Sequence, residues 1–283
     1  MTRVKAGLLV LAGLAVAAGA GGVVGAGAAI ALVKTAYNGP VDDTAGAELV
    51  VHSTQLGETV TLRIRLPVEY APQPDRRFPV VWVLDGPAQG SQVFTTMQVL
   101  SRIGVAEPAI VVEVPDSGAG RTTDLTPPPN VMTSVGGQGD RFLRFLADEA
   151  IPAVAEAFRT DSVRVLVGHS LGGLFALYAF AERPSLFGAY FAFSPSVWVG
   201  DEAVVPLLQE ALQRSGLDGT FLYASLGSDE GNRMLDGFEA VRRTLESYAP
   251  EQLTWRMDVT PDADHLSNPV LSFPVAARLY WSR

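Results

Sequence analysis

The chain has 283 residues, of which 48% are hydrophobic and 18% charged, so it can bury a sizeable core. Its formal net charge is −9 without a basic run, which argues against nucleic acid as a partner. Because cysteine is absent, disulfides, thiolate metal sites and a cysteine nucleophile are excluded. With no metal-binding cluster, phosphate loop or dinucleotide fingerprint in the sequence, we expect neither a metal nor a cofactor.

An uncharged apolar run, AGLLVLAGLAVAAGAGGVVGAGAAIALV, occupies residues 6–33. As a helix it would span ~42 Å, more than the ~30 Å apolar slab of a membrane. Arg3 and Lys5 precede the run and only Lys34 follows it closely. This bias favours a cytoplasmic N-terminus and an exported body.

We therefore predict that residues 1–34 form a transmembrane signal anchor that holds the protein to the cell membrane by a single span. Residues 35–46 would be a linker to the exported body. The alternative is a signal peptide cleaved near Ala18-Gly19-Ala20, which would release a secreted protein.

The rest of the chain alternates predicted strands with predicted helices. The first two strands show an edge-like alternation of apolar and polar residues, whereas the later ones are short apolar runs typical of buried parallel strands. This rhythm predicts an α/β fold for residues 47–283, with a mostly parallel sheet and helices on both faces. Strands are expected at 48–53, 59–66, 79–84, 109–114, 163–168, 189–194, 220–227 and 253–259, and helices at 140–158, 171–182, 201–214, 232–248 and 268–281.

Three loops are expected to shape a pocket at the carboxyl end of this sheet. They are residues 86–96, the long irregular stretch 115–138, and residues 195–202. Long irregular stretches in compact domains are usually functional or mobile.

Ser170 stands at the centre of Gly168-His169-Ser170-Leu171-Gly172, a G-x-S-x-G motif between a predicted strand and a predicted helix. In this context the motif is typical of a nucleophile held on a tight turn whose neighbours must be small. The backbone N–H of Leu171 would then face a developing oxyanion at the helix N-terminus.

A serine nucleophile needs a base, and the chain has three histidines. His52 lies in the first predicted strand, ahead of the parallel core, and is interpreted as structural. His169 leaves the turn on the other side from Ser170 and is expected to pack or hydrogen-bond beneath the site. His265 follows the last predicted strand and is therefore the candidate base.

The acid that orients the base should come from an intermediate strand, and Asp229 and Glu230 follow the strand at 220–227. Either carboxylate could hold His265. Asp262 and Asp264 are close to the histidine in sequence and are interpreted as solvated loop charges.

These residues together resemble the esterase D-like branch of the α/β-hydrolase superfamily, a family of predicted esterases near the ferric-siderophore trilactone esterases. Feruloyl esterases and mycolyltransferases are more distant relatives. The resemblance runs from about residue 48 onward and rests on LPVEY, VVWVLDG, RTTDLTP, FLRFLADEAIPAV, GHSLGGLFALYAF, LFGAYFAFSPSVW, GSDEGNRM and the late histidine.

The resemblance implies that Glu230 is the acid, since the branch places it at the fourth position of G-x-x-[DE], with Asp229 as the second choice. It also implies a second oxyanion donor after Leu84-Asp85-Gly86, where this chain has Pro87. Proline has no N–H, so the Pro87–Ala88 region is the uncertain part of the oxyanion hole, unless Ala88 or Gln89 substitutes.

The resemblance further implies that Asp85 braces the loop after its strand, and that Arg121 and Asp124 pin the long loop near the site. Gly86, His169 and Trp198 are the residues expected around the substrate pocket. Trp198 could equally be a residue that packs in the core.

We expect a serine hydrolase of carboxylic esters that acts outside the cytoplasmic membrane, through a Ser170–Glu230–His265 triad and an acyl-enzyme. The substrate would be a small-molecule or lipid ester. One alternative is an acyltransferase that acts on envelope sugars or lipids. The other, motivated by Pro87, is a weak or inactive α/β-hydrolase that serves as an interaction module in a membrane protein complex.

Overall fold

The computed structural model describes residues 46–128, 137–214 and 216–283. The predicted anchor, 1–34, and all but the last residue of the predicted linker, 35–46, lie outside these residues. Within the described part of the chain, no helix combines the length and apolar character needed to cross a membrane.

The core of the fold is an 8-stranded sheet with the order β1-β2-β4-β3-β5-β6-β7-β8. β2 runs antiparallel to both β1 and β4, and the strands from β4 through β8 are parallel. The mostly parallel sheet predicted from the sequence is thus confirmed. The strands are β1 Gly46–Ser53, β2 Glu58–Arg65, β3 Phe78–Val83, β4 Ile110–Glu113, β5 Thr160–His169, β6 Ala189–Phe193, β7 Phe221–Gly227 and β8 Thr254–Thr260.

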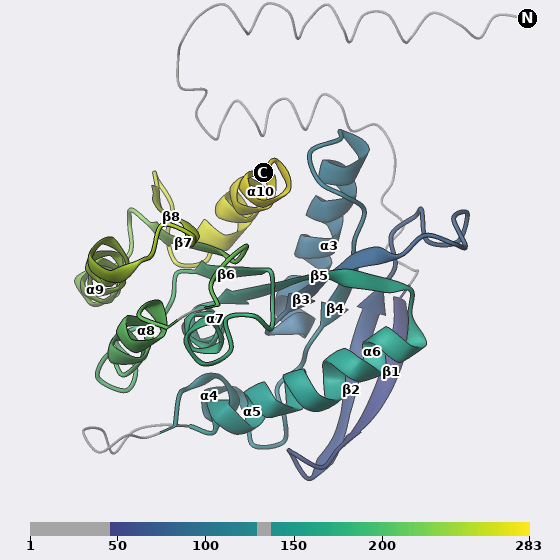
Figure 1. Cartoon of the computed structure of the whole chain (residues 1–283), viewed down its shortest axis with the longest axis horizontal. Helices are drawn as coiled ribbons and strands as arrows, with labels where there is room; N and C mark the ends of the chain where they lie inside the picture. Colours follow the sequence, from purple (N-terminus) through teal and green to yellow (C-terminus); the bar gives the residue numbers. More distant parts are fainter. Residues whose placement is uncertain (1–45, 129–136, 215) are drawn as a thin grey trace, which may run out of the picture. The chain divides into compact units, whose positions relative to one another are not determined.

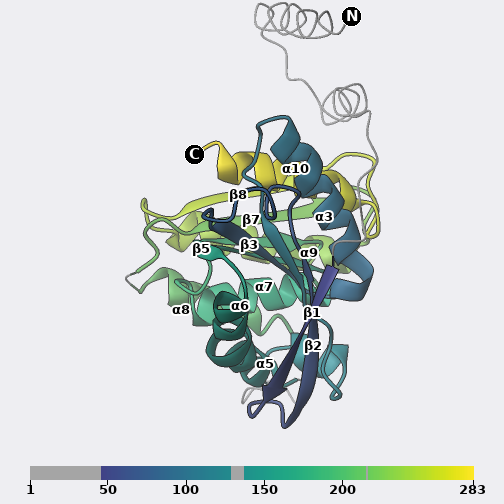
Figure 2. The same cartoon turned by 90° about the vertical axis from the view of Figure 1, so that its right-hand side faces the viewer.

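Helices cover both faces of the sheet (Figures 1 and 2). Two of them, α3 (Gly86–Arg102) and α10 (Asn268–Trp281), pack on one face. The remaining helices lie on the other face and enclose the larger apolar core. They are α4 Arg121–Leu125, α5 Gly139–Phe145, the π-helical turn η1 Leu146–Ala150, α6 Ile151–Ala157, α7 Leu171–Glu182, α8 Val204–Leu212 and α9 Asn232–Tyr248.

Three predicted helices, at 171–182, 232–248 and 268–281, have the predicted bounds. The loop predicted at 86–96 is wrong, because those residues belong to α3. The stretch 115–138 contains the short helix α4, and the helix predicted at 140–158 is interrupted by the π turn η1.

The helix α7 anchors the segment that begins at Ser170. Every residue from Gly172 to Ala181 is buried, so the helix is surrounded by protein on all sides. Burying a Leu or Phe side chain contributes roughly 1.5–3 kcal/mol each. The start of α7 is therefore held in a fixed position at the carboxyl end of β5.

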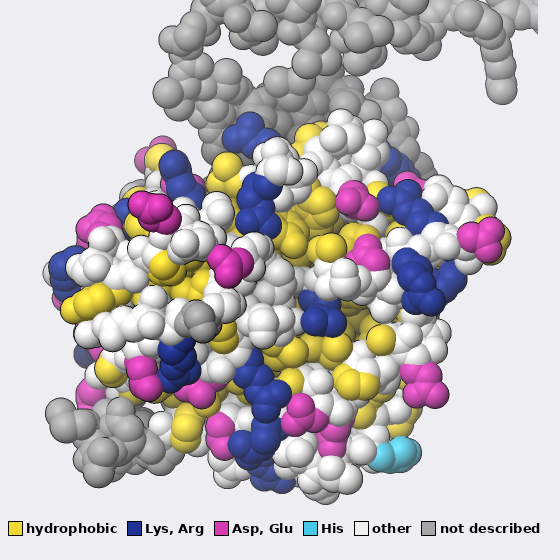
Figure 3. Space-filling view, in the orientation of Figure 1, with side chains coloured by type: hydrophobic (Ala, Val, Ile, Leu, Met, Phe, Trp, Pro, Cys, Tyr) yellow, Lys and Arg dark blue, Asp and Glu magenta, His cyan; other side chains and the backbone are white. Residues whose placement is uncertain are grey.

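The charged side chains are mixed on the face shown in Figure 3. Arginines are scattered over this face and stand among aspartates and glutamates. The acidic net charge thus arises without a segregated patch of one sign on this face.

Candidate active site

Ser170 occupies a strained turn between β5 and α7. Its φ of 61° and ψ of −116° are unusual for a residue with a side chain. A Cβ atom on Gly168 would lie only 2.0 Å from the carbonyl oxygen of Gly172. The turn therefore requires glycine two residues before the serine, as the motif predicts, and it projects Ser170 away from the sheet.

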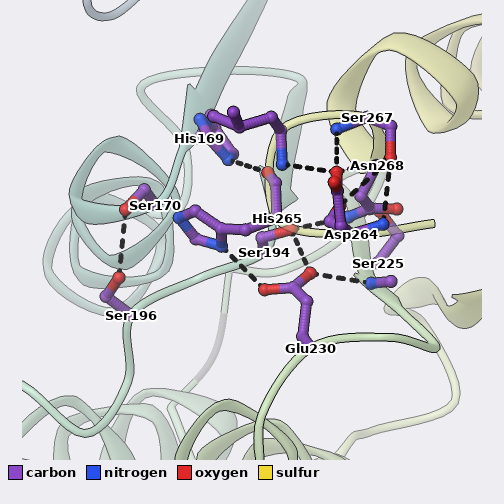
Figure 4. A network of polar contacts seen from close by, with 12 residues as sticks. His169, Ser170, Ser194, Ser196, Ser225, Glu230, Asp264, His265, Ser267 and Asn268 are labelled. Atoms are coloured by element: carbon purple, nitrogen blue, oxygen red, sulfur yellow. Dashed lines mark hydrogen bonds and ion pairs between the residues drawn. The ribbon is translucent and has the colours of Figure 1, made fainter.

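Ser170 and His265 line the same open pocket, which has a volume of about 460 Å³. The Oγ atom of Ser170 lies 3.2 Å from the Oγ of Ser196, which follows β6. The imidazole of His265 lies between Ser170 and Glu230 (Figure 4). The structure thus brings together the three residues that the sequence singled out.

Glu230 is the acid that contacts the histidine. Its Oε2 accepts a hydrogen bond from His265 Nδ1 at 2.7 Å, and its side chain is 1% exposed. Its Oε1 accepts from Ser194 Oγ at 2.6 Å and from Gly227 N–H at 2.8 Å. Burial disfavours the charged form, but the hydrogen bonds from His265, Ser194 and Gly227 outweigh it and lower the pKa of Glu230.

Asp229, the second candidate acid, lies apart from the histidine. Its carboxylate is exposed and accepts a hydrogen bond from the adjacent Ser228 at 3.0 Å. The sequence alone left two adjacent carboxylates open, and the turn after β7 directs only Glu230 toward His265.

A buried polar network behind Glu230 determines that the hydroxyl proton of Ser194 points toward Glu230. An ionised Glu230 can only accept hydrogen bonds, so Ser194 must donate to it and accept from Asn268 Nδ2, at 2.8 Å. The Oδ1 of Asn268 in turn accepts from Thr260 Oγ1 at 2.6 Å and Ser272 Oγ at 2.7 Å. Asn268 is fully buried at the start of α10. The sequence reading missed this residue, which no motif marks.

His169 supports the backbone of His265. Its Nε2 donates to the His265 carbonyl at 2.7 Å, and its Nδ1 accepts from Gln89 Nε2 at 3.1 Å. This pairing suits the neutral imidazole. Burial first, and the nearby charge of His265 second, lower the pKa of His169. His169 thus lies beneath the site, as predicted.

Asp264 stabilises the loop that contains His265 through hydrogen bonds to the backbone. Its carboxylate accepts hydrogen bonds from the backbone N–H groups of Leu266 at 3.0 Å and Ser267 at 2.8 Å. Asp264 is exposed, as expected for a solvated loop charge, and it also holds the turn that precedes α10. An aspartate three residues before a serine, ahead of a helix, is the local signal that could have found this turn.

His52 lies on the exposed side of β1, where its Nδ1 contacts Thr59 Oγ1 at 3.0 Å across the β1–β2 pair. This contact joins two strands at the edge of the sheet, in keeping with the structural role predicted for His52.

The oxyanion region offers fewer donors than the resemblance implies. Leu171 opens α7, so its N–H has no acceptor within the helix. Pro87 lies in the first turn of α3, where its missing N–H is tolerated. The N–H groups of Ala88 and Gln89 both bond to the carbonyl of Asp85, at 2.9 and 3.1 Å. Both N–H groups are thus already paired, and the alternative in which Ala88 or Gln89 substitutes for the missing donor is not seen.

Asp85 and Arg121 form an ion pair next to this region. Arg121 Nη2 donates to Asp85 at 2.8 Å and to the carbonyl of His169 at 3.3 Å. Asp124 accepts from the N–H and hydroxyl of Ser117, at 2.6 and 2.7 Å. These contacts join α4 to Asp85, just before α3, and to the segment that precedes α4, as the resemblance implies.

The pocket contains some of the expected residues and some that sequence reasoning missed. Trp198 lines it with 39% of its surface exposed, so packing in the core does not account for this residue. Gly86 and His169 are buried and are absent from the described lining. Ser196 lines it from the loop 195–202 that was expected to shape the pocket, whereas Arg233, in the motif GSDEGNRM, lines it and was not predicted to do so. Across 46–128, 137–214 and 216–283, no group of three or more His, Asp or Glu residues is suited to a metal ion.

A serine after β5, a glutamate after β7 and a histidine after β8, on a mostly parallel sheet, match the order of the catalytic residues in α/β-hydrolases. A family model described as "Putative esterase" matches residues 53–260. The chain belongs to this esterase family.

Individual relatives agree with the family. The chain is 36% identical over 135 residues to the siderophore triacetylfusarinine C esterase of Aspergillus fumigatus, a match that covers 44% of this chain and 46% of the relative. It is 30% identical over 178 residues to the ferri-bacillibactin esterase BesA of Bacillus subtilis, which covers 54% of this chain and 59% of the relative. The chain thus spans about half the length of the curated relatives it matches.

Among solved structures, an IroE-like serine hydrolase from Shewanella oneidensis is similar with a TM-score of 0.75 and 26% identity. The alignment covers 84% of this chain and 80% of that structure. The expected resemblance to the α/β-hydrolases near the siderophore esterases is confirmed.

Proposed function

We propose that the protein is a serine esterase that cleaves a small-molecule ester through an acyl-enzyme. Ser170 attacks the ester carbonyl while His265 Nε2 takes the hydroxyl proton. His265 then gives this proton to the departing alcohol. Water attacks the acyl-enzyme in the same way and frees the acid.

The other two roles follow from the contacts of the histidine and the serine. Glu230 holds the Nδ1–H tautomer of His265 and stabilises the imidazolium that forms during attack. Leu171 N–H, at the positive end of α7, donates to the oxyanion.

The observation that carries this proposal is the 2.7 Å contact between Glu230 and His265, in a pocket that also contains the strained Ser170. Strain at a non-glycine residue persists only where the surroundings impose it, and it gathers at functional sites. Two curated relatives are named as siderophore esterases, so a siderophore-type ester is the first substrate to test.

A fluorophosphonate probe tests the nucleophile. The wild type should be labelled and Ser170→Ala should not, while Ser228→Ala, which changes an exposed serine beside Asp229, should be labelled like the wild type. Equal labelling of wild type and Ser170→Ala would overturn the proposal. A panel of p-nitrophenyl, aryl and polyol lactone esters then defines the substrate class.

A second candidate function is supported by Pro87. With Ala88 and Gln89 N–H bonded to Asp85, the oxyanion keeps a single backbone donor, and loss of one donor typically lowers kcat by ~10²–10³. A catalytically weak α/β-hydrolase could serve as an interaction module instead. Stable co-purification with membrane proteins, together with no turnover of any ester in the panel, would favour this function.

We also propose that the esterase body acts outside the cytoplasmic membrane, held there by residues 1–34. The support is the apolar run and its flanking charges. Cell fractionation of the full chain and of a chain lacking residues 1–34 tests it. Equal recovery of both in the soluble fraction would contradict the anchor.

A further inference from the structure

A cation–π pair of an arginine and a tryptophan forms part of the pocket that contains Ser170. The guanidinium carbon of Arg233 lies 4.8 Å from the centroid of the Trp198 ring. Both residues line the pocket together with Ser170 and His265. They come from different segments, since Trp198 follows β6 and Arg233 belongs to the first turn of α9.

The stability of the fold does not account for this pair. A positive charge in the first turn of a helix opposes the helix dipole, which favours acidic residues there. No described carboxylate forms an ion pair with Arg233, although other arginines of the chain are paired. An indole left 39% exposed also forgoes burial of apolar surface. The pair therefore has an arrangement suited to a ligand rather than to the fold.

The charge of the pocket lining indicates which ligand. Arg233 is a permanent cation, and the described lining includes no carboxylate. An arginine guanidinium can donate two parallel hydrogen bonds from the N–H groups at its edge. A carboxylate matches this planar fork.

We propose that Arg233, in cation–π contact with Trp198, makes the site prefer esters whose chain carries a carboxylate or a comparable anionic group. Arg233 is then a specificity residue: it attracts and orients the anionic end of the substrate while Ser170 reacts with the ester. The inference rests on the proposed esterase activity and adds the charge of the substrate.

A matched pair of substrates tests the charge preference directly. p-Nitrophenyl hydrogen adipate carries a terminal carboxylate, and its methyl ester has the same chain without the charge. The wild-type ratio of kcat/KM for the charged over the neutral ester should be about fivefold or more, as for a partly exposed ion pair, and should shrink at high salt. Arg233→Gln should bring the ratio to about one by lowering only the value for the charged ester, and Arg233→Lys should keep part of it.

Arg243→Gln is the matched control, because Arg243 is an exposed arginine further along the same helix. It should leave the ratio unchanged. An Arg233→Gln variant that keeps the wild-type ratio, or a wild type without preference, would overturn the inference while leaving the esterase intact.

If the wild type turns over neither ester, the rate of covalent labelling tests the same preference. The rates at which Ser170 reacts with two fluorophosphonates, one ending in a carboxylate and one in its methyl ester, should show the same preference and the same loss in Arg233→Gln. Equal rates would overturn the inference alone. Absence of Ser170-dependent labelling with both probes would overturn the proposed esterase and the inference with it.

Discussion

His169 donates from Nε2 to the backbone carbonyl of His265 at 2.7 Å, and the centroids of the two rings lie 4.6 Å apart. The histidine next to Ser170 therefore holds the main chain of the histidine that follows β8. Because Gln89 donates to the other nitrogen of His169, protonation of His169 would break that contact. A protonated His169 would still donate from Nε2 to His265 but would lose its hydrogen bond with Gln89, so the pair of contacts suits the neutral imidazole.

This pairing predicts a loss of stability at mildly acidic pH. The pKa of His169 is lowered in the folded chain from its ordinary value of 6.5, chiefly by burial. Below about pH 6.5 the unfolded chain binds a proton that the folded chain does not, so the free energy of unfolding falls, by at most about 1.4 kcal/mol per pH unit. His169→Gln keeps a donor in the place of Nε2 and should flatten this dependence in urea unfolding between about pH 7 and pH 5.

His52→Gln is the control, since His52 is exposed on β1. It should retain the wild-type pH dependence. A His169→Gln curve as steep as the wild type would assign the acid sensitivity to other groups.

The adjacent acids Asp229 and Glu230 provide a matched test of the triad. Glu230→Gln removes the charge that stabilises the imidazolium and should lower kcat by about 10³–10⁴, as for other triads. Asp229→Asn should change kcat less than about twofold, because Asp229 contacts Ser228 rather than His265. Steady-state kinetics on the best ester of the panel, with thermal unfolding to check the fold, decides between them. Equal losses in the two variants would mean that the contact at 2.7 Å does not serve catalysis.

Ser194 is predicted to position Glu230. Removing its hydroxyl leaves one oxygen of Glu230 with Gly227 N–H alone, so kcat should fall about tenfold while KM stays nearly constant. The residue has a φ of 43°, so Ser194→Gly removes the same hydroxyl and also relaxes the backbone. Similar kcat values for Ser194→Ala and Ser194→Gly would assign the effect to the hydroxyl. A full recovery of kcat in the glycine variant would instead point to the backbone.

Pro87→Ala should increase turnover. The change supplies an N–H next to the oxyanion region, and the second position of α3 tolerates either residue. A recovered donor would raise kcat by up to ~10²-fold, with a small change in KM. A kcat equal to that of the wild type, in a variant of normal stability, would show that Pro87 does not limit the reaction.

Most of the fold could be predicted from the sequence, because its strands are short runs of apolar residues and its helices have marked ends. The helix α3 was missed since Gly86, Pro87 and Gly90 gave its first turns the composition of a loop. Its buried residues Val93, Phe94, Met97 and Leu100 nevertheless follow helical spacing, which is a signal that sequence reasoning could have used. The π turn η1 has no comparable signal, because the extra residue is accommodated by packing.

The sequence was sufficient to predict which residues form the candidate site, but not the hydrogen bonds that they make. Ser170 and His265 follow from the motif and from the scarcity of histidine. Pattern could not choose between Asp229 and Glu230, because the turn after β7 determines which of two neighbours faces the histidine. Nor could it show that the N–H groups of Ala88 and Gln89 are already bonded to Asp85, since that depends on α3 beginning where it does.

The order of the strands has a consequence for the kinetics of refolding. Ser170, Ser194, Glu230 and His265 follow β5, β6, β7 and β8, four neighbouring strands whose pairings join residues distant along the chain. Contacts of such long sequence separation form slowly. Collapse and helix formation can precede them, so chemical reactivity of the serine should return last, when β8 pairs with β7. The rate at which labelling of Ser170 returns during refolding would therefore report when the sheet is complete.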